Sequence, residues 1–183
     1  GTPAAFNKPS RAMANGIGLV PEDRHRDGLM LGMTVTENLA MATLAKFCRG
    51  LFLNSREMAE AAQTSIADLS IRPPDGRREV RLLSGGNQQK VLVGKWLKLA
   101  PRVLILDEPT VGVDVGAKAE IYGILRQERE RGTAILVVSS DLEEVMTIAD
   151  RIAVMVSGRL AALHDAGAIG SKELVREIGG VAA

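Results

Sequence analysis

The chain is poor in the residues that several classes of protein depend on. Among 183 residues there are one cysteine, Cys48, and two histidines, His25 and His164. A single cysteine excludes an internal disulfide, and so few sulfur and imidazole ligands nearly exclude a zinc site built from histidine and cysteine. Aromatic residues make up 3% of the sequence, which argues against a surface that stacks nucleic-acid bases. No apolar run approaches the roughly 18 residues of a membrane-spanning helix, so we expect any role at a membrane to be peripheral.

The sequence also lacks a strong excess of charge. Its formal net charge is +1, with 46% hydrophobic and 25% charged residues. These proportions are ordinary for a globular protein, and the length suits one domain with a subdomain. A charge so close to zero gives no sign of a polyanionic partner, and we therefore expect no nucleic acid to bind.

Two stretches stand out against this background. The first is Leu83-Ser84-Gly85-Gly86-Asn87-Gln88-Gln89-Lys90, which predicts a glycine-rich loop that opens a helix with Ser84 as N-cap. The glycines leave backbone N–H groups open to an anion at the positive end of the helix.

The second stretch is an apolar strand that ends in two carboxylates. Residues 103–106 are Val-Leu-Ile-Leu, and Asp107 and Glu108 follow directly. Ligands of open α/β sheets bind outside the carboxyl ends of the strands, where such carboxylates can meet a metal ion or water. Taken alone, the pair could simply end a strand and accept backbone hydrogen bonds.

Together, these stretches resemble ATP-binding-cassette (ABC) ATPases. Residues 83–90 resemble the signature loop in the form typical of sugar importers, and residues 104–110 resemble the Walker B strand with its catalytic glutamate. Residues 21–29, Pro-Glu-Asp-Arg-His-Arg-Asp-Gly-Leu, resemble a run in the second nucleotide-binding domain of monosaccharide importers. The resemblance covers roughly residues 11–165. No Gly-x-x-x-x-Gly-Lys-Ser/Thr phosphate loop (Walker A) occurs, so we expect the domain to be truncated before residue 1.

The resemblance implies an α/β fold, namely a P-loop NTPase core that lacks its phosphate-loop strand and carries an inserted all-helical subdomain. We expect a partial core with the Q-loop-like segment at residues 1–29, the helical subdomain at 30–98, and the rest of the core at 99–183. In the family the missing strand lies between those at 134–138 and 152–156. We therefore expect these two strands to pair directly, or to associate with another chain, because unpaired strand edges are costly to bury.

The pattern along the chain agrees with this division. Residues 16–20 predict a short strand and 22–27 a charged loop; capping residues at Thr34 and Asn54 predict helices, the first running to Phe47. Met58, Ala62, Ile66 and Leu69 share one face of the second helix, which indicates a core-facing stripe. Beyond Pro101 we expect a helix capped by Asp114, a second buried strand at 133–139, a capping box at residues 140–143, and a third strand at 152–156 that turns into 159–164.

The resemblance also assigns roles to individual residues. Glu108 would be the general base, and Asp107, together with Glu22 at the Q-loop position, would hold Mg²⁺. The nucleotide-binding residues would be Ser84, Gly85, Gly86, Asn87, Asp114 and Ser140. Asp114 matches the D-loop, which crosses the dimer interface, and it can also be a plain N-cap; both can hold. His25 and His164 are interpreted as surface residues.

Two of these positions depart from the family pattern. Glu22 stands where the family has glutamine, and Ser140 where it has a switch histidine. A carboxylate adds negative charge near phosphates, and a hydroxyl cannot carry the charge of an imidazolium.

The resemblance implies an ATP- and Mg²⁺-dependent, energy-coupling ATPase of a simple-sugar importer, peripheral to the cytoplasmic face of the inner membrane. Its partners would be transmembrane permease subunits, a second nucleotide-binding domain fused upstream, and indirectly a periplasmic sugar-binding protein. The alternative is a catalytically degenerate, regulatory half that lends its signature loop to the other nucleotide site. The DNA-repair branch of the superfamily is disfavoured, because only 61 residues separate Glu22 from Ser84, with no sustained heptads.

Overall fold

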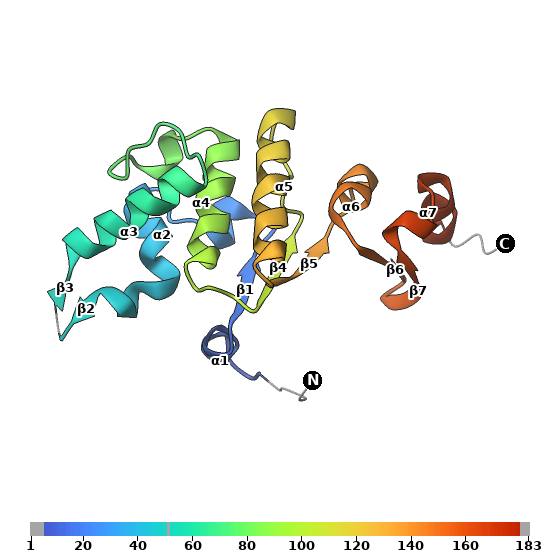
Figure 1. Cartoon of the computed structure of the whole chain (residues 1–183), viewed down its shortest axis with the longest axis horizontal. Coiled ribbons are helices and arrows are strands. Elements are labelled where there is room, and N and C mark those ends of the chain that lie inside the picture. The colour runs from blue at the N-terminus through green and yellow to red at the C-terminus, as the bar shows by residue number, and fades with distance from the viewer. Residues whose placement is uncertain (1–5, 51, 180–183) are drawn as a thin grey trace. The chain divides into compact units, whose positions relative to one another are not determined.

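A computed structural model describes residues 6–50 and 52–179, which divide into two compact units (Figure 1). The first unit runs to Val138 and the second begins at Ser139. None of the described helices is both long enough and apolar enough to span a membrane. The predicted boundaries at residues 29 and 98 remain predictions.

The first unit is built on a parallel sheet of three strands in the order β1-β4-β5. The strands are β1 (Ile17–Val20), β4 (Val103–Asp107) and β5 (Ala134–Val138). Leu104 and Leu106 of the central strand are fully buried, as is Val20 of its neighbour. The predicted strands at 16–20 and 103–106 and their parallel arrangement are therefore confirmed.

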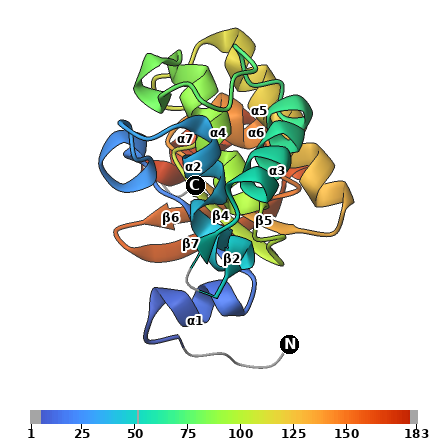
Figure 2. The same ribbon diagram turned by 90° about the vertical axis from the view of Figure 1, so that its left-hand side faces the viewer.

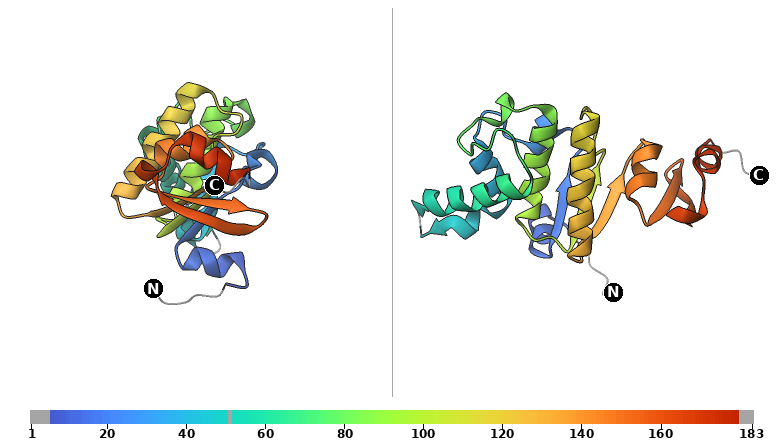
Figure 3. Two further views of the ribbon diagram at one scale, coloured as in Figure 1. Left: turned by 90° about the vertical axis from the view of Figure 1, so that its right-hand side faces the viewer. Right: turned by 45° about the horizontal axis from the view of Figure 1, so that its top comes forward.

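Helices cover this sheet and extend beyond it. Figure 2 shows α2 and α3 next to one another, and the right-hand view of Figure 3 shows α4 and α5 side by side. The predicted stripe is confirmed, because its three members on α3 and Leu69, the residue directly after the helix, are all buried. The helices of this unit are α1 (Pro9–Ala14), α2 (Val35–Ala40), α3 (Ser55–Asp68), α4 (Gly85–Leu97) and α5 (Val115–Glu130), with 3₁₀ segments at Met41–Phe47 and Val80–Leu82.

The helical region and the charged loop before it differ from their predictions in three places. The helix that Thr34 caps ends at Ala40 and continues only as a 3₁₀ segment, in which Thr43 leaves helical geometry (φ −127°, ψ 21°). The region is not entirely helical, because β2 (Cys48–Arg49) and β3 (Phe52–Leu53) form a small antiparallel pair. The predicted charged loop contains a helical turn of the wide, π type at Arg24–Gly28.

The strand predicted to be buried at 133–139 is largely exposed. Leu136 and Val138 of β5 keep about half of their surface exposed, 53% and 51%. The reason is that β5 is an edge strand in the sheet of the described residues, with β4 as its partner. Apolar, β-branched composition indicated a strand correctly, but burial depends on neighbours that composition does not reveal.

The second unit is a hairpin with two helices and its own core. Strands β6 (Arg151–Val156) and β7 (Arg159–Asp165) pair antiparallel, so the predicted turn at Ser157-Gly158 is confirmed. The third strand therefore pairs with β7, and the direct pairing of 134–138 with 152–156 does not occur among the described strands. The unit is completed by α6 (Leu142–Ile148), a 3₁₀ turn at Ala166–Ala168 and α7 (Ser171–Ile178), around a core of Ile152, Val154, Ile169 and Leu174.

Candidate nucleotide-binding site

The centre of the candidate site is the carboxyl end of β4. Asp107 is the last residue of the strand and lies opposite Val138 in the register with β5. Glu108 follows with φ +45°, a left-handed conformation that is uncommon for a residue other than glycine. Its backbone N–H donates to the carbonyl of Val138 at 2.8 Å. The chain therefore turns sharply at Glu108, directly after the strand.

Glu22 comes to the same edge of the sheet. Val20 ends β1 and pairs in register with Leu106 of β4, so Glu22 follows the neighbouring strand in parallel. The described residues contain no group of three or more His, Cys, Asp or Glu side chains that could hold a metal ion by themselves. Mg²⁺ is usually bound through one or two carboxylates together with water and phosphate oxygens. A carboxylate at the end of each of two adjacent strands fits a magnesium ion that arrives with a nucleotide.

Ser84 begins α4 in the predicted manner. Its side chain accepts from the N–H of Asn87 at 3.5 Å and from Asn87 Nδ2 at 2.9 Å, and Ser84 remains exposed. The first turn of α4 contains no acidic residue. Asn87 Oδ1 also accepts from the N–H of Arg72 at 2.7 Å, which ties the helix start to the preceding loop. An exposed, uncharged helix start with a positive dipole end is suited to an anion.

The two glycines allow α4 to approach the start of α5. A Cβ on Gly86 would lie 2.4 Å from the Cβ of Ala117, and one on Gly85 would lie 3.1 Å from the carbonyl oxygen of Gly112. Asp114 caps α5, because its Oδ1 accepts from the N–H of Ala117 at 2.9 Å. The structure thus brings the signature loop and the segment that resembles a D-loop into direct contact, and the predicted N-cap role of Asp114 is confirmed.

Sequence reasoning missed two residues that contact this region. Arg24 donates from Nη1 to the carbonyl of Val111 at 2.8 Å, and His25 Nε2 lies 2.8 Å from Gln88 Oε1. His25 is exposed as predicted, but it contacts the signature helix. The charged run after β1 was the signal in the sequence that could have pointed to these two residues. By itself, however, such a run also fits a turn exposed to solvent.

Asp23 fixes the geometry of that run. Its Oδ1 accepts from the N–H groups of Arg26, at 3.0 Å, and His25, at 2.9 Å. These two hydrogen bonds favour the carboxylate and hold the pKa of Asp23 below its usual value. Asp23 is thus the N-cap of the turn that carries Arg24 and His25.

Two lysines of α4 anchor the helix from within. Lys90 is 3% exposed; its Nζ donates to the carbonyl of Ser70 at 2.9 Å and pairs with Glu120 on α5. Lys95 donates to the carbonyl of Gly28 in the charged run, and burial lowers the pKa of its ammonium group. The helix that begins with the signature loop is therefore tied to α5 and to the Arg24–Gly28 turn.

Ser140 belongs to the second unit and is exposed there. The prediction of a capping box at residues 140–143 that starts with Ser140 is wrong, because the cap of the helix lies one residue later. Asp141, not Ser140, is the N-cap of α6, and its side chain accepts from the N–H groups of Glu143 and Glu144. A carboxylate is as good a cap as a hydroxyl, and here it reaches two donors at once.

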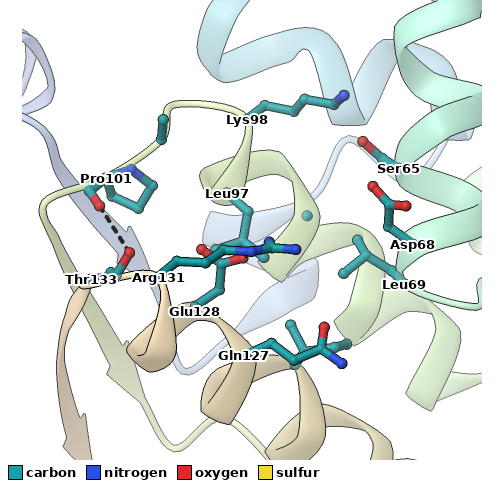
Figure 4. Close-up of a pocket in the computed structure, with 13 residues that line it drawn as sticks. Ser65, Asp68, Leu69, Leu97, Lys98, Pro101, Gln127, Glu128, Arg131 and Thr133 are labelled. Carbon is teal, nitrogen blue, oxygen red and sulfur yellow. Dashed lines mark hydrogen bonds and ion pairs between the residues drawn. The ribbon is translucent and has the colours of Figure 1, made fainter.

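A separate cleft of about 390 Å³ opens at the opposite edge of the sheet. Figure 4 shows Thr133, which precedes β5, donating to the carbonyl of Pro101, which precedes β4, at 3.2 Å. Lys98, Asp68 and Arg131 also line the cleft. It therefore lies at the amino ends of the strands, away from Asp107 and Glu108.

Comparisons with known proteins agree with the geometry. The sequence profile of a family described as "ABC transporter" matches residues 2–111. A ribose import ATP-binding protein of Chromobacterium violaceum is 47% identical over 91% of this chain and 33% of its own length. A putative ribose/galactose/methyl galactoside import ATP-binding protein of Rhizobium etli is 44% identical over 87% of this chain and 30% of its length. The chain thus spans about a third of these curated relatives.

Solved structures show the same fold. A dimeric ATP-binding cassette in a post-hydrolysis state, bound to ADP and phosphate, superposes with a TM-score of 0.73 at 21% identity, over 88% of this chain and 68% of that one. A nucleotide-free cassette from an ABC transporter gives 0.73 at 23% identity, over 95% and 68%. The predicted P-loop NTPase fold is confirmed.

Proposed function

Since the chain belongs to the ABC transporter family, we propose that it forms most of the second nucleotide-binding domain of an ATP-hydrolysing subunit that energises import of a simple sugar. One observation carries this proposal. The glycines of the signature loop pack directly on the start of α5 and the segment before it, and that segment follows Asp107, which ends β4, and Glu108. The names of the relatives, which are ribose and galactoside import proteins, supply the substrate class.

The residues take complementary roles in this proposal. Glu108 accepts a proton from the attacking water as general base, and Asp107 and Glu22 hold Mg²⁺, which neutralises phosphate charge when bound with ATP. Ser84, Gly85, Gly86 and Asn87 offer the amino end of α4 to the γ-phosphate of ATP on an opposing domain. Asp114 keeps the neighbouring loop in place, and Ser140 contributes a hydroxyl to phosphate. The exposed, uncharged start of α4 supports the assignment to an opposing nucleotide.

The proposed partners follow from the family. They are transmembrane permease subunits, a second nucleotide-binding domain fused upstream, and a periplasmic sugar-binding protein that acts through the permease. The chain would work at the cytoplasmic face of the inner membrane as a peripheral component. Closure of two domains on ATP and reopening after hydrolysis would move the permease.

A second candidate function rests on the departures at Glu22 and Ser140. A carboxylate at the first position and a hydroxyl at the second weaken the site that they would complete. In this alternative the domain lends Ser84–Gly86 to ATP on the other domain and hydrolyses little itself.

Single-turnover hydrolysis at this site in the intact protein distinguishes the two candidates. For an active site, Glu108→Gln lowers the rate on the order of 10²-fold or more, because the amide keeps the shape but cannot take a proton. ATP binding stays unchanged. Glu130→Gln, an exposed position near the end of α5, is the matched control. A rate that barely responds to Glu108→Gln refutes hydrolysis here and supports the regulatory half.

A further inference from the structure

Arg24 joins two loops that are distant in the sequence. Its Nη1 donates to the carbonyl of Val111 at 2.8 Å, and its Nη2 lies 3.5 Å from the carbonyl oxygen of Gly112. The same Nη2 lies 3.2 Å from the point where a Cβ on Gly85 would stand. One guanidinium therefore contacts the segment before α5 and the first residue of α4 at once.

The turn that carries Arg24 is itself fixed to α4. His25 contacts Gln88 at 2.8 Å, and Lys95 reaches back to the carbonyl of Gly28. A Cβ on Gly28 would lie 2.9 Å from Cδ2 of Leu92, so the turn packs closely on the helix. The position of the guanidinium is thus set by α4, and the backbone of Val111–Gly112 is held relative to α4 through it.

From these contacts we propose that Arg24 is a positioning residue, which holds the backbone of Val111–Gly112 against the amino end of α4 and so sets the spacing between the signature loop and the loop before Asp114. A guanidinium suits this task because its planar fork can donate to two successive carbonyl oxygens from a fixed orientation. The ammonium of a lysine is a point charge without that fork. No substrate contact is assigned to Arg24.

Loss of Arg24 should loosen the loop without unfolding it. Val111 and Gly112 are exposed, so water can replace the guanidinium at their carbonyl groups. The loop also keeps its own turns, in which Val111 donates to the carbonyl of Glu108 at 3.3 Å and Val113 to that of Thr110 at 3.2 Å. What disappears is the connection to α4, and the effect should therefore be local.

Amide hydrogen exchange in the intact protein tests this directly. In Arg24→Ala we expect exchange in a peptide spanning residues 109–118 to become about tenfold faster, the change that corresponds to losing one hydrogen bond from a charged donor. Arg24→Lys should recover part of the protection. The control is Arg26→Ala, in the same turn, whose side chain is 82% exposed and faces Asp27; it should leave this peptide unchanged.

Two results overturn the proposal. Exchange within twofold of wild type in Arg24→Ala means that the guanidinium does not hold the loop. Faster exchange of similar size in α3 and α7 means that Arg24 supports the whole fold and has no positioning role.

A kinetic measurement extends the inference and rests on the proposed function. If Ser84–Gly86 serve ATP on the opposing domain, Arg24→Ala lowers kcat for that ATP while its KM changes little, because the loop is misplaced only when the domains close. If amide exchange of the loop becomes faster while kcat stays unchanged, the positioning role of Arg24 stands, and the proposed use of the signature loop for ATP on the opposing domain is refuted. The two failures are therefore distinguishable.

Discussion

The three-stranded sheet has a carboxyl edge, where its parallel strands end, and an amino edge, where they begin, and the two differ in the residues that they present. At the carboxyl edge lie the residues that we propose to bind phosphate and metal; among them Ser84 is exposed, and Gly85 and Gly86 pack against the next loop. At the amino edge, Lys98 and Arg131 line a cleft of about 390 Å³ with acidic groups close by. In the proposed function the reaction takes place at the carboxyl edge, so the cleft at the amino edge would not mark the site of the chemistry. A site completed by a second domain is expected to be an open face in one domain alone.

Strand direction explains why the two edges cannot exchange roles. Parallel strands end together, so Glu22, which follows β1, and Asp107, the last residue of β4, come to one edge. The amino edge receives the carboxyl end of α4 and Thr133, whose hydroxyl is used to bridge to Pro101.

The largest effect expected concerns nucleotide affinity. The 183 residues contain no glycine-lysine phosphate loop, and the carboxyl edge presents Asp107 and Glu108, both negative. We therefore expect this chain by itself to bind Mg·ATP weakly or not at all in a calorimetric titration. Low-micromolar affinity would show that the carboxyl edge is a complete site in one domain alone, which contradicts the comparison drawn above.

A smaller but still large effect is expected from Gly86→Ala. The new methyl group would stand 2.4 Å from the Cβ of Ala117, so the starts of α4 and α5 must separate. Overpacking of this kind costs about 1–3 kcal/mol of unfolding free energy. Gly123→Ala, within α5, is the control, because nothing lies within 4 Å of its Cβ position; it should stabilise by about 0.5–1 kcal/mol. Urea unfolding measures both, and equal stabilities would contradict the close approach.

Arg131→Ala probes the amino edge. The side chain is 69% exposed and pairs with Glu128 three residues earlier, so its loss should cost about 1 kcal/mol or less. ATP turnover of the intact protein should stay within about twofold of wild type, since surface substitutions away from a site act weakly. A large fall in turnover with normal stability would give the cleft a part in the reaction.

The smallest effect expected is a change in acid stability. The folded-state pKa of Asp23 is lowered by hydrogen bonds from Arg26 and His25, so its stabilising contribution is present above the ordinary value of 3.8 and is lost as pH falls through the folded value. Asp23→Asn keeps a cap but does not titrate. Unfolding midpoints from pH 6 to pH 2 should therefore decline slightly less in the variant. Parallel curves would mean that the carboxylate gains nothing from the turn.

Sequence patterns correctly predicted the features that depend on neighbouring residues in the chain. Ser84 and Asp114 cap their helices as expected, because each needs only donors within three residues, and the Val103–Leu106 strand follows from four apolar residues in a row. At residues 140–143 both Ser140 and Asp141 could have capped the helix. Asp141 is the cap, because its side chain accepts hydrogen bonds from two backbone N–H groups.

Predictions failed for features that depend on contacts with residues far away in the sequence. The exposure of β5 depends on which strands pair with it, and no feature of residues 133–139 reveals that. The contact between Arg24 and Val111 joins positions 87 residues apart, so a charged run read alone gave no reason to single it out. The site roles of Glu108 and Asp107 remain predictions from the family resemblance.

The hydrogen bond from Glu108 to Val138 has a mechanical consequence. It extends the hydrogen bonding between β4 and β5 by one residue, so the backbone of Glu108 is held by β5 as well as by its own strand. Among the described strands β5 is the edge of its sheet, and edge strands readily accept another strand. A strand that pairs along β5 would therefore also hold the backbone of Glu108, the proposed general base, more firmly at the end of the central strand β4.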